Sequence, residues 1–149
     1  KVHNLFVAKI NKQKIEWASV LPKRQRAGAE GYSNVPHKLY SFYAFQRKGE
    51  LHLIYNEMKE NLAITDEFKL EKGYYNKPKD CDLVHCKIDL SSGVLKSKES
   101  VLGLKEDGVA IYPNETKVLN DGSLLLLGVK PEYSLKEPSY IQFGHWILD

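Results

Sequence analysis

The stretch SFYAFQRKGELHLIYNEMKEN, residues 41–61, contains two apolar segments on either side of the turn sequence RKGE. Both segments are rich in aromatic and aliphatic residues, including the types that are enriched in β-strands. Two such segments joined by a short Gly-containing link predict a β-hairpin. The polar continuation NEMKEN, residues 56–61, predicts a loop, and loops on a rigid β-scaffold commonly carry binding sites.

Short segments of the same character recur along the whole chain. Links such as NKQK (11–14), SSG (91–93) and NDGS (120–123) separate them and predict antiparallel connections, and the Asp-Gly pair predicts a type I′ turn. An all-β, antiparallel protein follows. The predicted strands are 5–10, 15–21, 39–45, 50–55, 82–88, 94–102, 117–119, 123–129 and 140–148.

Length and composition indicate one folded domain over residues 1–149, because 42% of the residues are hydrophobic and 28% are charged. The net charge of +3 is spread along the chain, so no nucleic-acid partner is predicted. No apolar run approaches the ~20 residues of a membrane helix, so no membrane span is predicted. The chain begins at Lys1 without a Met, and we expect a fragment of a longer protein.

An internal repeat is predicted, because residues 4–61 and 82–129 share the order strand, turn, strand, loop, strand, turn, strand. Four-stranded antiparallel units in tandem are typical of β-propeller blades. We therefore expect two propeller-like four-stranded units plus a terminal strand at 140–148. With blades of about 40–50 residues, this chain would form only three blades, fewer than the four to eight that close a ring. A longer propeller, closure with another copy, a β-sandwich or a small barrel stay open.

The segments IEWASVLPKRQ (15–25), ELHLIYNEMKEN (50–61), KIDLSSG (87–93) and AIYPNETKVLNDGSLLLLG (110–128) carry a family resemblance. Together they resemble a group of uncharacterised bacterial proteins with propeller-like C-terminal regions. The resemblance implies a propeller-like fold and a periplasmic, cell-surface or secreted setting. It implies no catalytic residues.

The residues that usually carry chemistry do not form a recognised motif. The five histidines show neither H-x-x-x-H nor the i, i+2 spacing that places two ligands on one face of a strand, so we predict no metal and no cofactor. Cys81 and Cys86 would lie too far apart on an extended chain for a disulfide, and Cys86 has the apolar neighbours of a buried structural thiol.

Aromatic residues are concentrated around the opening stretch. Alternation places Tyr43 and Phe45 on one face of the strand at 39–45, and Tyr40 and Phe42 on the other. A strand that is apolar on both faces is expected between two neighbouring sheets. A glycan-binding platform or a protein interface is the alternative use of these rings.

The function predicted from these patterns is a non-catalytic binding or scaffolding module with a protein or a glycan as partner, and with self-association through open sheet edges as a further possibility. One alternative is a glycan hydrolase that uses acidic residues of the 56–67 segment, for which Glu57 and Glu60 form the carboxylate pair. Another is a structural part of a larger propeller. The predicted contact residues are Lys23, Arg24, Gln25, Tyr32, Asn56 and Asn61.

Overall fold

The computed structural model describes residues 4–23, 25–26, 41–64, 69, 73–74, 81–103, 108–131 and 138–148. This part of the chain is all-β, as predicted, with short 3₁₀ turns at Lys59–Asn61 and Pro113–Glu115. All its strand pairs are antiparallel except the short pair β3–β6. The strands are β1 (Leu5–Asn11), β2 (Lys14–Leu21), β3 (Gln25–Arg26), β4 (Phe42–Arg47), β5 (Glu50–Met58), β6 (Gly73–Tyr74), β7 (Cys81–Asp89), β8 (Leu95–Gly103), β9 (Ala110–Ile111), β10 (Lys117–Val118), β11 (Leu124–Pro131) and β12 (Pro138–Trp146).

The centre of the fold is a four-stranded sheet in the order β4-β5-β7-β8. The hairpin quoted above supplies its first two strands, and β5 then pairs with β7 along its whole length, from Glu50 opposite Asp89 to Met58 opposite Cys81. The β4–β5 turn has positive φ at Lys48 (48°) and Gly49 (78°), as a type I′ turn requires. Twist-matched turns of this kind keep neighbouring strands in register.

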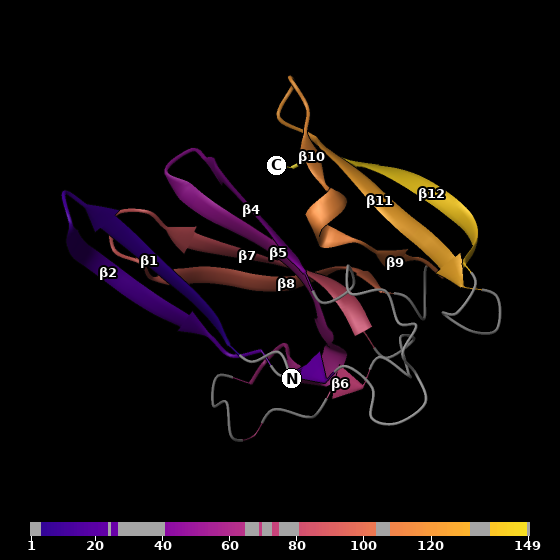
Figure 1. Cartoon of the computed structure of the whole chain (residues 1–149), viewed down its shortest axis with the longest axis horizontal. Coiled ribbons are helices and arrows are strands. Elements are labelled where there is room, and N and C mark those ends of the chain that lie inside the picture. The colour runs from indigo at the N-terminus through magenta and orange to yellow at the C-terminus, as the bar shows by residue number, and fades with distance from the viewer. Residues whose placement is uncertain are drawn as a thin grey trace.

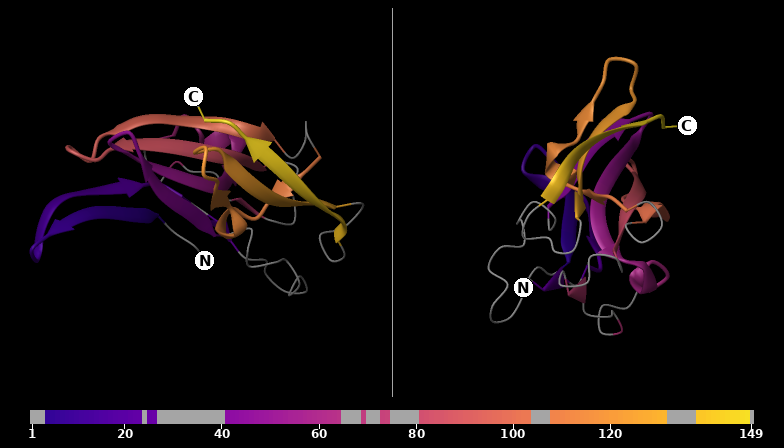
Figure 2. Two further views of the ribbon diagram at one scale, coloured as in Figure 1. Left: turned by 90° about the horizontal axis from the view of Figure 1, so that it is seen from above. Right: turned by 90° about the vertical axis from the view of Figure 1, so that its right-hand side faces the viewer.

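Two further sheets cover the two faces of the central sheet (Figure 1). The hairpin β1–β2 lies on one face, and β11 with β9, β10 and β12 lies on the other (Figure 2). Strand alternation explains this layering, because successive side chains of β5 point to opposite faces. Leu53 and Tyr55 belong to the core on the β1–β2 side, whereas Ile54 belongs to the core on the β11 side.

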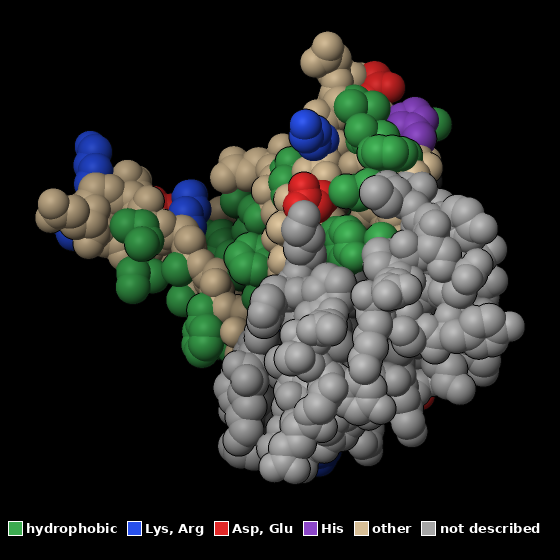
Figure 3. All heavy atoms as spheres, turned by 45° about the vertical axis from the view of Figure 1, so that its right-hand side comes forward, with side chains coloured by type: hydrophobic (Ala, Val, Ile, Leu, Met, Phe, Trp, Pro, Cys, Tyr) green, Lys and Arg blue, Asp and Glu red, His purple; other side chains and the backbone are tan. Residues whose placement is uncertain are grey.

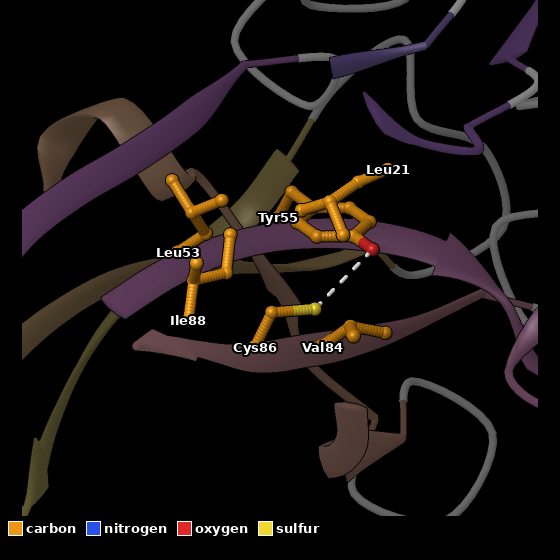
Figure 4. Close-up of a cluster of buried hydrophobic side chains, with 6 residues drawn as sticks. All are labelled: Leu21, Leu53, Tyr55, Val84, Cys86 and Ile88. Carbon is orange, nitrogen blue, oxygen red and sulfur yellow. Dashed lines mark hydrogen bonds between the residues drawn. The ribbon is translucent and has the colours of Figure 1, made fainter. Parts of the chain in front are cut away.

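The core on the β1–β2 side joins one strand of the hairpin to two strands of the central sheet (Figure 4). Leu21 from β2 lies against Tyr55 from β5 and Cys86 from β7 in a cluster of buried side chains. The Tyr55 hydroxyl lies 3.5 Å from the Cys86 sulfur. Both cysteines, Cys81 and Cys86, are free thiols, which confirms that they do not form a disulfide with each other.

The hairpin β1–β2 is also anchored at the β7–β8 turn. The indole Nε1 of Trp17 donates a hydrogen bond of 3.0 Å to the backbone oxygen of Leu90, and the Ser19 hydroxyl donates to the backbone oxygen of Gly93. The Trp17 ring lies so close to Gly93 that an added Cβ would meet ring carbons at 2.6 Å. A glycine is therefore required for this contact.

The structure groups the strands differently from the predicted repeat units 4–61 and 82–129. The central sheet takes β4 and β5 from the first unit and β7 and β8 from the second, while β1 and β2 form a sheet of their own. The physical reason is that local sequence determines each hairpin. Which hairpins join edge to edge depends on side-chain packing between residues far apart in the chain. A closed ring is not present among the described residues, so the propeller stays a prediction.

Two local predictions were wrong. The strand at 39–45 is not buried on both faces: β4 is an edge strand, and Phe42 is 50% exposed. The strands that are buried on both faces are β5 and β7. At 120–123, only Gly122 has positive φ, because the Asp121 carboxylate accepts hydrogen bonds from Ser123 and sets a different turn.

None of the helical segments in the described ranges is both long and apolar enough to cross a membrane.

We predict that Gly93→Ala lowers the free energy of unfolding by about 3 kcal/mol, because the new Cβ meets the Trp17 ring and the residue must keep a positive φ. Gly49→Ala is the matched control. Gly49 also has positive φ, but nothing lies within 4 Å of its added Cβ, so the expected loss is about 1 kcal/mol. Urea unfolding of both variants measures the difference. Equal losses would contradict the Trp17 contact.

Candidate functional site

The outer side of the hairpin β1–β2 is a surface of apolar side chains, because alternate residues of its strands point away from the central sheet, with a register shift next to Ile15. Within the described part of the chain, no other sheet covers this side. Figure 3 shows hydrophobic side chains along one side of the hairpin that projects at the left. We call this surface the outer hairpin face; it consists of Phe6, Ala8, Ile10, Ile15, Ala18 and Val20.

The outer hairpin face is unusually exposed for its composition. Phe6 is 79% exposed, Ile10 67% and Ile15 66%. The register places Phe6 opposite Val20 and Ala8 opposite Ala18, so the apolar residues of the two strands form pairs. The summed apolar area is on the order of 500 Å², near the upper end for a single chain and typical of an interaction site.

The predicted contact residues Lys23 and Asn61 lie in a buried polar cluster, and not in a solvated loop. Lys23 is 1% exposed, with its Nζ 5.0 Å from the centre of the Tyr55 ring. Asn61 is fully buried and donates a hydrogen bond of 3.1 Å from Nδ2 to Oε1 of Glu57. Burial lowers the pKa of Lys23 to about 8, an effect that Glu57 partly offsets. Burial also raises the pKa of Glu57.

The remaining predicted contact residues do not join this cluster. Asn56 lies inside β5, not in a loop, and its Nδ2 donates a hydrogen bond of 2.9 Å to the backbone oxygen of Ile111 on the opposite face. Gln25 lies in β3, and the structure does not describe its side chain. Arg24 and Tyr32 lie outside the described residues.

The acidic pair of the hydrolase alternative is also separated by burial. Glu57 is fully buried at the end of β5, while Glu60 is exposed in the 3₁₀ turn that follows. A glycosidase needs both carboxyl groups on one substrate. The segment 56–61 that was predicted as a loop is therefore the end of a strand and a turn with buried polar residues, and this geometry does not present a carboxylate pair to solvent.

Two histidines that the sequence did not bring together are in direct contact on the β11-facing side of the central sheet. Nδ1 of His52 on β5 lies 2.9 Å from Nε2 of His85 on β7. The Phe45 ring stacks on His52 with ring centres 4.8 Å apart, and Trp146 meets His85 edge to face with ring centres 5.0 Å apart. The signal that could have found this pair is the strand register: His85 pairs with Ile54, so His52 is its diagonal neighbour.

A carboxylate lies at each end of the histidine pair. Oε2 of Glu50 is 3.7 Å from Nε2 of His52, and Oε1 of Glu99 is 3.5 Å from Nδ1 of His85. Burial, together with smaller effects of His52 and Lys87, lowers the pKa of His85 to about 4. Burial lowers the pKa of His52 as well, against the opposing effect of Glu50. Both imidazoles are therefore neutral at neutral pH.

The described residues contain no group of three or more His, Cys, Asp or Glu side chains arranged to hold a metal ion. Comparison of the chain with protein-family models, with curated proteins and with solved structures finds no match.

We predict that the histidine pair makes the fold sensitive to acid. The pKa of His85 is about 4 in the folded protein and about 6.5 when unfolded, so its contribution is complete above pH 6.5 and is lost as the pH falls toward 4. Between about pH 7 and pH 5 the free energy of unfolding should fall by about 2 kcal/mol through His85 alone.

The measurement is urea unfolding of the wild type and of His85→Gln at several pH values. The variant should show a flatter profile over this interval. His145→Gln is the control, because His145 is an exposed histidine on β12. A His85→Gln profile parallel to that of the wild type would mean that His85 is not held neutral by the fold.

Proposed function

We propose that this chain is a non-catalytic scaffolding module that binds a β-sheet of a partner protein on the outer hairpin face. The observation that carries the proposal is the exposure of paired apolar residues on a sheet that is already packed on its other side, with Phe6 at 79% and Ile10 at 67%. Apolar surface of this extent is stabilised when another apolar surface removes it from water.

The fold itself supports a β-sheet as the partner. The inner side of the same hairpin packs face to face on the central sheet through Leu5, Val7 and Trp17. The outer side of these same two strands has a similar pattern, aliphatic residues with one aromatic ring. Two twisted sheets pack well only when their twists match. A further antiparallel sheet therefore suits the outer hairpin face better than a helix or an extended peptide does.

A larger β-propeller is the assembly that this proposal favours. In a propeller, antiparallel sheets pack face to face around a ring, and four to eight sheets close it. The opposite end of this stack of sheets also presents apolar residues, because Phe143 on β12 is 70% exposed and Leu125 on β11 is half-buried. A stack with apolar surface at both ends is what an open arc of such a ring would present.

The test of this proposal is a site-specific photo-crosslinker at position 6 in cells that make the protein. We expect adducts whose partner sites, mapped by mass spectrometry, are alternate residues on antiparallel strands, since one face of a sheet exposes every second residue. A crosslinker at position 42 is the matched control. Phe42 is also an exposed phenylalanine, but it lies on β4, the edge strand of the central sheet. It should not give the same adducts.

A paired substitution gives an independent measurement. With the photo-crosslinker placed instead at position 20, which pairs with position 6, Phe6→Lys with Ile10→Lys should abolish the crosslink to the partner. The midpoint of thermal unfolding should stay within a few degrees, because both substituted side chains are exposed. Phe42→Lys should leave the crosslink intact. Adducts to helices, loops or lipid would overturn the proposal, whereas adducts to the chain's own strands would show that a second copy is the partner sheet.

A further inference from the structure

The outward side of the β11–β12 sheet is a second apolar surface, at the opposite end of the stack of sheets from the outer hairpin face. Leu124, Leu126 and Trp146 point inward, because they pack in the core on the β11 side. The residues between them point away from the central sheet, and the register places Leu127 opposite Phe143. We call this surface the terminal sheet face; it consists of Leu125, Leu127, Phe143, His145 and Ile147.

The terminal sheet face leaves much of its apolar area in water. Phe143 and Ile147 are each 70% exposed, and Leu125 and Leu127 are half-buried. Their summed apolar area is on the order of 300 Å², in addition to the roughly 500 Å² of the outer hairpin face. Each face alone falls in the range of the largest apolar patch that a monomer normally exposes, and this chain carries two of them.

The charges favour contact between the two unlike faces. The six residues of the outer hairpin face are all uncharged. The terminal sheet face has a positive neighbour, because Lys117 on β10 lies opposite Leu125 and therefore on the same side of the sheet. Two terminal sheet faces in contact would bring two lysines together, at a cost in free energy. A terminal sheet face on an outer hairpin face brings no like charges together.

Contact between unlike faces also removes the most apolar surface from water. If two outer hairpin faces met, the terminal sheet face of each copy would stay exposed. When the outer hairpin face of each copy packs on the terminal sheet face of the other, two equal junctions cover all four faces. Each junction buries on the order of 800 Å² of apolar area, or roughly 1,400 Å² in total if about 57% of an interface is apolar. Two such junctions reach the range of obligate homodimers, about 2,000–5,000 Å².

Two copies supply a number of sheets that can close a ring. Each copy stacks three sheets face to face, namely the hairpin β1–β2, the central sheet and the β11–β12 sheet (Figure 1). Rings of packed antiparallel sheets close with about four to eight sheets. Two copies give six sheets, whereas three copies give nine. A contact between unlike faces that does not close would continue into a fibre.

We propose that two copies of this chain close a ring of six sheets, in which the outer hairpin face of each copy packs on the terminal sheet face of the other. The inference rests on the proposed function, because it names the partner sheet of the outer hairpin face. The two can fail separately. A monomeric chain whose position 6 crosslinks to a sheet of a different protein would overturn this inference and leave the proposed function intact.

The experiment is sedimentation equilibrium of the purified chain and of single variants. At about 10 μM the wild type should have twice the mass of one chain. Phe6→Lys and Phe143→Lys each place a charge in both junctions, so each should raise the dimer dissociation constant at least about 100-fold and give monomers. Phe42→Lys is the matched control, because Phe42 is an exposed phenylalanine outside both faces, and it should stay dimeric.

Mixing the two variants tests whether unlike faces meet. An equal mixture of Phe6→Lys and Phe143→Lys at about 100 μM should form dimers, because the intact hairpin face of one variant and the intact terminal sheet face of the other still make one junction. Thermal unfolding verifies that each variant is folded, and Phe6→Ser and Phe143→Ser replace a variant that is not. A monomeric wild type, a dimeric Phe143→Lys, a monomeric mixture or an assembly of three or more copies would each overturn the inference.

Discussion

The structure depends on the burial of β5 and β7 on both of their faces. Leu53 and Tyr55 on one face and Ile54 on the other are at most 2% exposed, and β7 opposite them is equally buried. A sheet that is apolar on both faces is stable only when two further layers cover it. Burial stabilises the fold by about 25 cal/mol for every Å² of apolar surface, and a face left in water does not contribute this free energy. The hairpin β1–β2 and the β11–β12 sheet are those layers.

The same burial explains the polar clusters of this protein. Long strands that run through the middle of a three-layer fold carry some polar residues with them, and a buried polar group is costly unless it finds a partner. His52 therefore pairs with His85, and Asn56 bonds to the backbone of Ile111. Asn61 bonds to Glu57 at the end of β5. Of these contacts, the one from Asn56 ties the central sheet to β9, while the other two place titratable groups where protonation affects stability.

The outer hairpin face shows one consequence of layered packing. The hairpin β1–β2 has apolar residues on both sides, such as Phe6 outside and Trp17 inside. Within the described fold, only the inner side is packed against another sheet. The other side is the exposed outer hairpin face.

The sequence by itself determined the strands, because alternation and β-propensity act within a few residues. Segments such as 50–55 and 82–88 lie within observed strands, and the antiparallel hairpin at 41–61 is present. It did not determine the grouping of hairpins into sheets, the burial of Lys23 and Asn61, or the contact of His52 with His85. Only the tertiary structure decided these, because they depend on which faces pack together, and that packing joins residues whose separation along the chain carries no local signal.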